Sequence, residues 1–311
     1  MTMIAGLGFL DESYLISDSR ISYSGQKGPE DRLMKVFQLA PKLMVAFASE
    51  HVHFTLEVLR RITEYSLKNI DPKKARFILP HLVRKANFEY SNLLSECKIK
   101  TPPRMELLYC GVIDKPQMFS SYLLDKIMKR RKNSSFKVPE KIGRAMMERT
   151  RGIWTLSPPC PIIYKQLFPN DSPHPYIYLG YTTGGSGQEV FYELEKEYYD
   201  FFDWDLGTTK GIILENIIDE YIKKNNIPTV GGIVQVWRIN QDGITPITYQ
   251  RKRHKDNTDE DEMTRELRFQ DGSWTLTDHE SGENLKSMKI STDYLNPKKK
   301  TKVSKSSWSN Y

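Results

Sequence analysis

Two neighbouring apolar segments place the strongest constraint on how this chain can fold. Residues 33–39 and 43–48 are typical of two strands joined by a short turn around Pro41. Successive side chains of a strand point to opposite faces, so the two faces can be separated by alternation. One face would carry Leu33, Phe37, Val45 and Phe47, and the other Met34, Val36, Met44 and Ala46. Because both faces are apolar, we expect this hairpin to be covered on both sides.

Lys35 is the exception inside this hairpin. Folding the hairpin about Pro41 places Lys35 opposite Phe47, with apolar neighbours on either side. Desolvation lowers the pKa of a buried lysine unless a carboxylate compensates its charge. The alternative is a lysine at a sheet edge or on the surface, which the apolar coverage disfavours.

An earlier hairpin brings polar residues together near the start of the chain. Residues 3–9 and 14–19 are typical of two short strands, and folding them about residue 11 pairs residue i with roughly residue 22 − i. Thr2 then lies beside the strand end that carries Asp18, Ser19 and Arg20. If Met1 is removed, the α-amine of Thr2, with a pKa of about 7.7 to 8.0, can act as a base for its own hydroxyl.

The remaining pattern predicts the layers of the fold. Helices are expected near 54–65, 72–97, 188–202 and 208–225, and strands at 105–113, 118–124, 176–182, 233–239 and 244–249. The strands at 105–113 and 118–124 would be joined by a turn at 114–117, and a Gly-Gly-Ser-Gly turn would follow the strand at 176–182. This order predicts an α+β protein over residues 1–250, built as a four-layer αββα sandwich.

Charge and proline mark two segments as additions to that sandwich. Residues 123–151 hold ten Lys or Arg against three acids, an excess equal to the net charge of +7 of the whole chain. A proline-rich stretch at 158–175 follows and is expected to be an irregular loop, so the insertion would span about 123–175. Residues 251–311, with 13 basic and 11 acidic side chains, are expected to form a charged, partly disordered extension.

The residues around Thr2 resemble the proteasome β-subunit family of N-terminal nucleophile hydrolases. Met-Thr at the start, Asp18-Ser19-Arg20 after a hairpin and Met34-Lys35-Val36 in a strand carry the resemblance. Further matches are Val45 to Ser49 leading into a helix, Gly185-Ser186-Gly187 between a strand and a helix, and Gly231-Gly232 before the last core strand. The resemblance covers about residues 2–122 and 176–249.

The resemblance implies a role for each matching residue. Thr2 would be the nucleophile through its hydroxyl and the base through its amine, Lys35 would act electrostatically, and Asp18 would hold Lys35. Ser186 would hydrogen-bond near the amine, and the backbone N–H of Ser49 would stabilise the tetrahedral intermediate. Arg20 would be structural and pair with a carboxylate, and Phe47 would line an apolar or shallow substrate pocket.

Two features depart from the family pattern. The family carries an Asp and, three residues on, a Ser before the Gly-Gly pair, where this chain has Ile227 and Val230. Asn226 or Thr229 would have to replace that polar support. The basic insertion and the C-terminal extension also lie outside the family pattern.

Other chemistries have weaker signals. The run from Thr182 to Gln188 is glycine-rich but lacks the Gly-Lys-Ser/Thr ending of a phosphate-binding loop. His51 and His53 are two residues apart, which gives no metal signature, and we expect neither a metal nor a cofactor. The three cysteines, Cys97, Cys110 and Cys160, have no CxxC spacing and are expected to be free thiols.

The sequence therefore predicts a threonine peptidase, with a catalytically inactive relative as the alternative. The peptidase would cleave peptides or unfolded proteins, and the resemblance implies a homo-oligomer with an ATPase or other regulatory partner. The inactive relative would be a scaffold acting through the basic insertion, which could bind nucleic acid or an acidic partner. No apolar run is long enough to span a membrane, and Asp11 and Glu12 lie where a signal peptide would be apolar, so we expect a cytoplasmic protein without a membrane partner.

Overall fold

The computed structural model describes most of the core and part of the remaining chain. The described residues are 2–8, 12–21, 30–31, 33–69, 78–113, 117–120, 147–150, 153–156, 160–169, 180–187, 229–231, 234–247, 249–254, 261–270, 273–278 and 284–289. Within them, no helix is long and apolar enough to cross a membrane.

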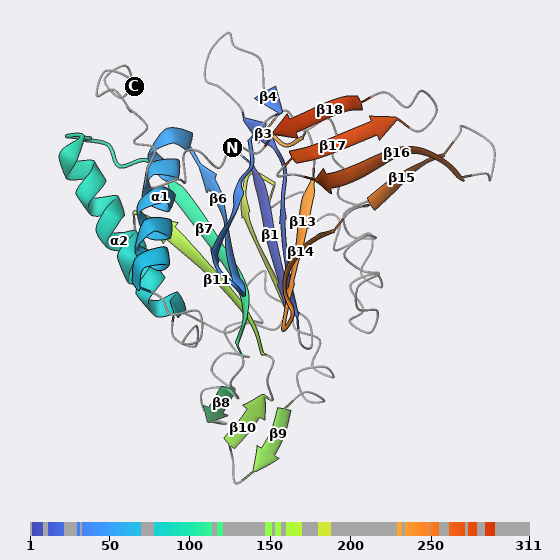
Figure 1. Ribbon diagram of the computed structural model, residues 1–311. Coiled ribbons are helices and arrows are strands. Elements are labelled where there is room, and N and C mark those ends of the chain that lie inside the picture. The colour runs from blue at the N-terminus through green and yellow to red at the C-terminus, as the bar shows by residue number, and fades with distance from the viewer. Residues whose placement is uncertain are drawn as a thin grey trace.

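Two antiparallel sheets form the centre of the structure (Figure 1). The five-stranded sheet has the order β12-β1-β2-β13-β14. Its strands are β1 (Met3–Gly8), β2 (Ser13–Ser17), β12 (Gly180–Gly185), β13 (Gln235–Asn240) and β14 (Gly243–Ile247). The four-stranded sheet has the order β11-β7-β6-β5. Its strands are β5 (Val36–Ala40), β6 (Leu43–Ser49), β7 (Met105–Ile113) and β11 (Cys160–Phe168).

The two sheets pack face to face around one apolar cluster. Ile4, Leu15 and Trp237 come from the five-stranded sheet and meet side chains of the four-stranded sheet. Those opposing side chains include Met44, Ala46, Leu108, Cys110 and Ile163. A hydrogen bond of 2.7 Å from the Ser13 hydroxyl to the carbonyl of Gly111 also joins the two layers.

Helices α1 (Val52–Asn69) and α2 (Ile78–Glu96) cover the other face of the four-stranded sheet. Phe54 of α1 and Tyr90 of α2 pack edge to face, with ring centroids 5.3 Å apart. The predicted faces of the second hairpin are confirmed, because Phe37 and Phe47 belong to the helix-side cluster while Val36 and Ala46 belong to the cluster between the sheets.

The outer face of the five-stranded sheet is also buried. Strand alternation places Ala5, Leu7, Tyr14, Ile16 and Val236 on this face, and none is more than 1% exposed. The helices expected near 188–202 and 208–225 lie outside the described residues. The described elements of this core make three layers: a helix pair and two sheets.

The registers of the two hairpins had different outcomes. In the second hairpin, Val36 pairs with Ala46 and the N–H of Phe47 donates to the carbonyl of Lys35 at 3.1 Å, as predicted. In the first hairpin, Ile4 pairs with Ser17, so paired residue numbers sum to 21 and the predicted register was wrong by one residue. In the observed register Asp18 lies next to Met3, and the Asp18 N–H donates to the carbonyl of Met3 at 3.2 Å.

Two predicted connections in the middle of the chain were wrong. β7 does not form a hairpin with β8 (Gln117–Ser120), because β7 pairs with β6 and β11. β8 instead joins β9 (Met147–Thr150) and β10 (Ile153–Leu156) in a separate three-stranded sheet. An irregular loop was expected from Pro158 onward, but Cys160–Phe168 is strand β11, while Pro158 and Pro159 lie outside the described residues. Pro161 is tolerated in β11 because β11 lies at the edge of its sheet.

A further expectation was wrong at two glycines. Gly184 and Gly185 were expected in a turn but end strand β12. Within the described residues, the C-terminal segment contains a four-stranded sheet. Its strands are β15 (Tyr249–His254), β16 (Asp261–Gln270), β17 (Ser273–Asp278) and β18 (Asn284–Lys289). A short pair, β3 (Arg20–Ile21) and β4 (Glu30–Asp31), completes the described strands.

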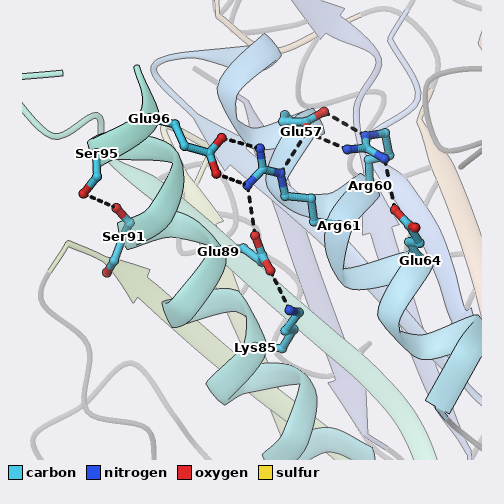
Figure 2. A network of polar contacts seen from close by, with 9 residues as sticks. All are labelled: Glu57, Arg60, Arg61, Glu64, Lys85, Glu89, Ser91, Ser95 and Glu96. Atoms are coloured by element: carbon cyan, nitrogen blue, oxygen red, sulfur yellow. Dashed lines mark hydrogen bonds and ion pairs between the residues drawn. The ribbon is translucent and has the colours of Figure 1, made fainter. Parts of the chain in front are cut away.

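Charged side chains join the two helices above the core (Figure 2). The Arg61 guanidinium of α1 reaches Glu57 on its own helix at 2.9 Å and Glu89 and Glu96 on α2 at 3.1 and 2.6 Å. The neighbouring Arg60 contacts only glutamates of its own helix in Figure 2. Burial alone would raise the pKa of Glu57, but hydrogen bonds from Arg60 and Arg61 outweigh it and hold that pKa below its ordinary value.

Replacing each arginine separately tests this helix contact. We expect Arg61→Met to lower the free energy of unfolding by roughly 1.5 to 3 kcal/mol, because it removes several charge-assisted hydrogen bonds between helices. Arg60→Met serves as the matched control and should cost about 0.2 to 1 kcal/mol. Urea unfolding at neutral pH measures both.

The stabilisation that Arg61 provides depends on pH. The pKa of Glu96 is lowered by its hydrogen bond from Arg61, and that of Glu57 is also lowered. The stabilisation is therefore present above the ordinary glutamate range and is lost as pH falls through the lowered values. Equal losses for the two variants at neutral pH would contradict the interhelical role of Arg61.

The close approach of the two sheets gives a second test. A Cβ on Gly6 of β1 would lie 2.6 Å from the Sγ of Cys110 in β7. We expect Gly6→Ala to lower the free energy of unfolding by about 1 to 3 kcal/mol through overpacking. The loss should be smaller when the change is made in a Cys110→Ala background, and urea unfolding of the four proteins measures it. Equal losses in both backgrounds would show that Cys110 does not limit the approach.

Candidate active site

A polar cluster is buried where strands from both sheets end. Thr2 precedes β1, Asp18 follows β2 and Lys35 precedes β5. Their exposed fractions are 3%, 0% and 2%. The structure therefore brings together the three residues that the sequence analysis placed at the centre of the site, and it buries Lys35 as expected.

The three side chains are joined by hydrogen bonds. The Thr2 hydroxyl donates to Oδ1 of Asp18, and Nζ of Lys35 donates to Oγ1 of Thr2. Nζ also lies 2.8 Å from Oδ1 of Asp18 and 2.5 Å from the carbonyl oxygen of Arg20. An ammonium has three donors, and these three acceptors account for all of them.

Asp18 is held by backbone groups as well as by Lys35. Its Oδ1 accepts the N–H of Met3 at 2.9 Å, and its Oδ2 accepts the N–H groups of Gly231 and Arg20 at 3.2 and 3.3 Å. A buried carboxylate is stable only when it is paired and hydrogen-bonded, and Asp18 meets both conditions. These contacts join the end of β2 to the segment before β13.

Arg20 strengthens the same junction. Its guanidinium donates to the carbonyl oxygen of Val230 at 3.2 Å. A Cβ on Gly231 would lie 2.4 Å from Cζ of Arg20, so the glycine makes room for the guanidinium. These contacts give Arg20 a structural position at this junction.

The end of β12 holds the backbone of Thr2. The N–H of Gly187 donates to the carbonyl oxygen of Thr2 at 3.2 Å. Gly185 has a φ of +75°, and a Cβ there would lie 2.0 Å from that oxygen. Only glycine fits this position, because both the backbone conformation and the close approach exclude a side chain.

Ser186 lies between these two glycines and has a polar partner. Its hydroxyl shares a hydrogen bond of 2.9 Å with the hydroxyl of Thr229. Val230 is fully buried, and Ile227 lies outside the described residues. Thr229 thus supplies a polar group next to Ser186, while Asn226, the other residue considered for this support, lies outside the described residues.

Ser49 and Phe47, at the end of β6, lie outside the cluster of hydrogen-bonded side chains of Thr2, Asp18 and Lys35. The Ser49 hydroxyl accepts the N–H of His51 at 3.0 Å and the Thr55 hydroxyl at 2.6 Å, which places Ser49 at the start of α1. Among the described contacts, none joins Ser49 to Thr2. Its neighbour Ala48 does approach the site, 3.1 Å from where a Cβ on Gly185 would lie. Phe47 is 1% exposed and stacks on Phe37.

The structure also bears on the competing chemistries. Gly185 and Gly187 use their N–H groups within the protein, on Glu106 and Thr2, which disfavours a phosphate-binding loop at 182–188. No group of His, Cys, Asp and Glu within the described part of the chain could hold a metal ion. The three cysteines form no disulfide, as expected, and burial raises the pKa of the Cys110 thiol.

Comparisons with known proteins add no relative. No protein-family model matches the chain, and no curated protein is similar to it in sequence. The resemblance to proteasome β subunits therefore rests on the residues around Thr2.

Charge removal at this site has a distinctive energetic pattern. Asp18→Asn and Lys35→Met should each lower the free energy of unfolding by about 3 to 5 kcal/mol, because each leaves the other charge buried without its partner. The double variant removes both charges and should lose less than the sum of the two. A double-mutant cycle measured by urea unfolding gives the coupling. Additive losses would mean that the two charges do not compensate one another.

Proposed function

We propose that this protein is a threonine-type N-terminal nucleophile peptidase with an αββα core. The observation that carries the proposal is the Thr2 hydroxyl, which lies buried between the carboxylate of Asp18 and the ammonium of Lys35. The helix pair, the two facing sheets and the buried outer face of the five-stranded sheet support the proposed core.

In the proposed reaction, the Thr2 oxygen attacks the carbonyl carbon of a peptide bond. The α-amine of Thr2 takes the hydroxyl proton and then delivers it to the nitrogen of the departing peptide, which leaves an ester on Thr2. A water molecule then attacks the ester carbon and gives up a proton to the amine. The bond between that carbon and the Thr2 oxygen breaks, the amine returns the proton to the Thr2 oxygen, and the peptide fragment leaves with a new carboxyl group. The ammonium of Lys35 stabilises the negative charge that develops on the oxygen, and Asp18 keeps Lys35 in place.

This reaction requires a free amine on Thr2. A residue attached before Thr2 would convert that nitrogen into an amide, which is not a base, so everything that precedes Thr2 must be removed. Ser186, supported by Thr229, is the proposed polar neighbour of the amine. The backbone N–H of Ser49 is the proposed donor to the oxyanion, because Ser49 follows Ala48, which packs next to Gly185.

The wider function is part of the same proposal. Substrates would be peptides or unfolded proteins, and the protein would act in the cytoplasm as a homo-oligomer with an ATPase or other regulatory partner. The proposed chemistry needs no cofactor, since the nucleophile, the base and the stabilising charge all belong to the chain. The alternative scaffold function would depend on residues 123–151, of which only 147–150 are described.

Replacing the nucleophile tests the proposal directly. We expect Thr2→Ala to abolish hydrolysis of short fluorogenic peptides and to remove labelling by an electrophile selective for an N-terminal threonine. Thr2→Ser is the matched control, because it keeps a hydroxyl and an amine and should retain measurable activity. Intact-mass measurement of the native protein should show Thr2 as the first residue, with an unmodified amine.

Two results would contradict this proposal. Undiminished hydrolysis by Thr2→Ala would assign the activity to another group. Retention of Met1 or acetylation of Thr2 in all of the native protein would leave the hydroxyl without its base, and the scaffold function would then be favoured.

A further inference from the structure

A second polar cluster contacts Gly185, the residue that packs against the carbonyl oxygen of Thr2. Glu106 of β7 and Lys165 of β11 form an ion pair of 3.0 Å between Oε2 and Nζ. The same Oε2 accepts the N–H of Gly185 at 3.2 Å, and Nζ of Lys165 donates to the carbonyl oxygen of Thr183 at 2.9 Å. The proposed peptidase mechanism uses neither of these charged side chains.

This cluster joins the two sheets at one edge. Glu106 and Lys165 belong to the four-stranded sheet, whereas Thr183 and Gly185 belong to β12 of the five-stranded sheet. β12 is an edge strand, with β1 as its single strand neighbour within the sheet. The contacts from Glu106 and Lys165 therefore hold the end of β12 from a second direction.

The end of β12 is also the part of the structure that holds Thr2. Gly185 pairs with Met3 in the ladder between β1 and β12, and its Cα faces the carbonyl oxygen of Thr2. Gly187 donates its N–H to the same oxygen. Any displacement of Gly185 would therefore move the backbone of Thr2.

Gly184 and Gly185 have no side chains where Glu106 and Thr2 approach β12. A Cβ on Gly184 would lie 2.5 Å from Oε2 of Glu106, and a Cβ on Gly185 would lie 2.0 Å from the carbonyl oxygen of Thr2. Gly184 thus makes room for the carboxylate, and Gly185 makes room for the nucleophilic residue. Two consecutive residues of β12 thus make the close contacts with Glu106 and with Thr2.

We propose that Glu106 is a positioning residue: through its hydrogen bond to Gly185, it sets the position of the Thr2 backbone and hence of the Thr2 hydroxyl. Lys165 supports this role by neutralising the carboxylate and fixing its direction. The inference rests on the proposed peptidase function for its effect on catalysis. The contact itself between Glu106 and the end of β12 is independent of that function.

The test compares variants of Glu106 in the full chain. Glu106→Leu removes the acceptor for the Gly185 N–H, and Glu106→Gln keeps an acceptor oxygen while it removes the charge. Glu57→Gln in the helix pair is the control for a general loss of stability, because Glu57 contacts arginines of α1. Gly184→Ala is a second way to displace the carboxylate, should Glu106→Leu fail to fold.

Two measurements are made on each variant. The first is amide hydrogen exchange at Gly185 and Gly187, which we expect to be faster in Glu106→Leu and unchanged in Glu57→Gln. The second is peptide hydrolysis, where we expect kcat to fall on the order of 10- to 100-fold in Glu106→Leu with little change in KM, because the nucleophile is misplaced. In Glu106→Gln we expect amide exchange and kcat to be close to those of the wild-type protein.

The outcomes separate this inference from the peptidase proposal. Unchanged exchange at Gly185 and Gly187 in both Glu106→Leu and Gly184→Ala would overturn the positioning role, whatever the activity. Faster exchange with full kcat would also overturn it, because Thr2 would not depend on the contact. Absence of hydrolysis by the wild-type protein would reject the peptidase function, and the exchange data would still decide whether Glu106 holds the end of β12.

Discussion

The buried ion pair between Asp18 and Lys35 is the interaction on which the described core depends most. Each charge would be strongly unfavourable alone at an exposed fraction of 0% or 2%. The pair is tolerated because Lys35 has three acceptors and Asp18 receives backbone N–H groups from segments far apart in the sequence. These hydrogen bonds require the ends of β1, β2 and β5 and the segment before β13 to meet at one point. The two sheets must therefore pack in one arrangement to satisfy this pair.

A second constraint acts on the same point from the edge of the five-stranded sheet. The segment from Gly184 to Gly187 lies between the Glu106–Lys165 pair and the backbone of Thr2. Close packing leaves no space for a side chain at either glycine that ends β12. The position of Thr2 is thus defined from two sides: by Asp18 and Lys35 at its hydroxyl, and by β12 at its carbonyl. These contacts fix the orientation of Thr2, and a fixed orientation favours reaction of the nucleophile proposed here.

Local patterns predicted the elements better than their partners. The period of two in residues 33–48 placed Phe37 and Val36 on the correct faces, since alternation is a local property of a strand. Pro161 was misleading, because an edge strand tolerates proline and edge position is not a local property. The same reason explains why β7 was wrongly paired with β8: strand neighbours are chosen by the whole sheet. The pairing of Ser186 with Thr229 was open in the sequence and is a tertiary contact.

The sequence by itself determined the two hairpins that carry Thr2, Asp18 and Lys35. Turn length and apolar alternation are properties that local residues control, so Thr2 and Asp18 meet at the end of the first hairpin and Lys35 is buried beside the second. Only the tertiary structure decided which groups surround them, and the contact of Lys35 with Thr2 and Asp18 itself requires the two sheets to pack on each other. Glu106, Lys165 and Gly185 come from strands that are separated from Thr2 by about a hundred residues or more, and no local pattern encodes that contact. Their positions follow from the packing of one sheet on the other, because only that packing brings the edge strand β12 against the carboxylate of β7.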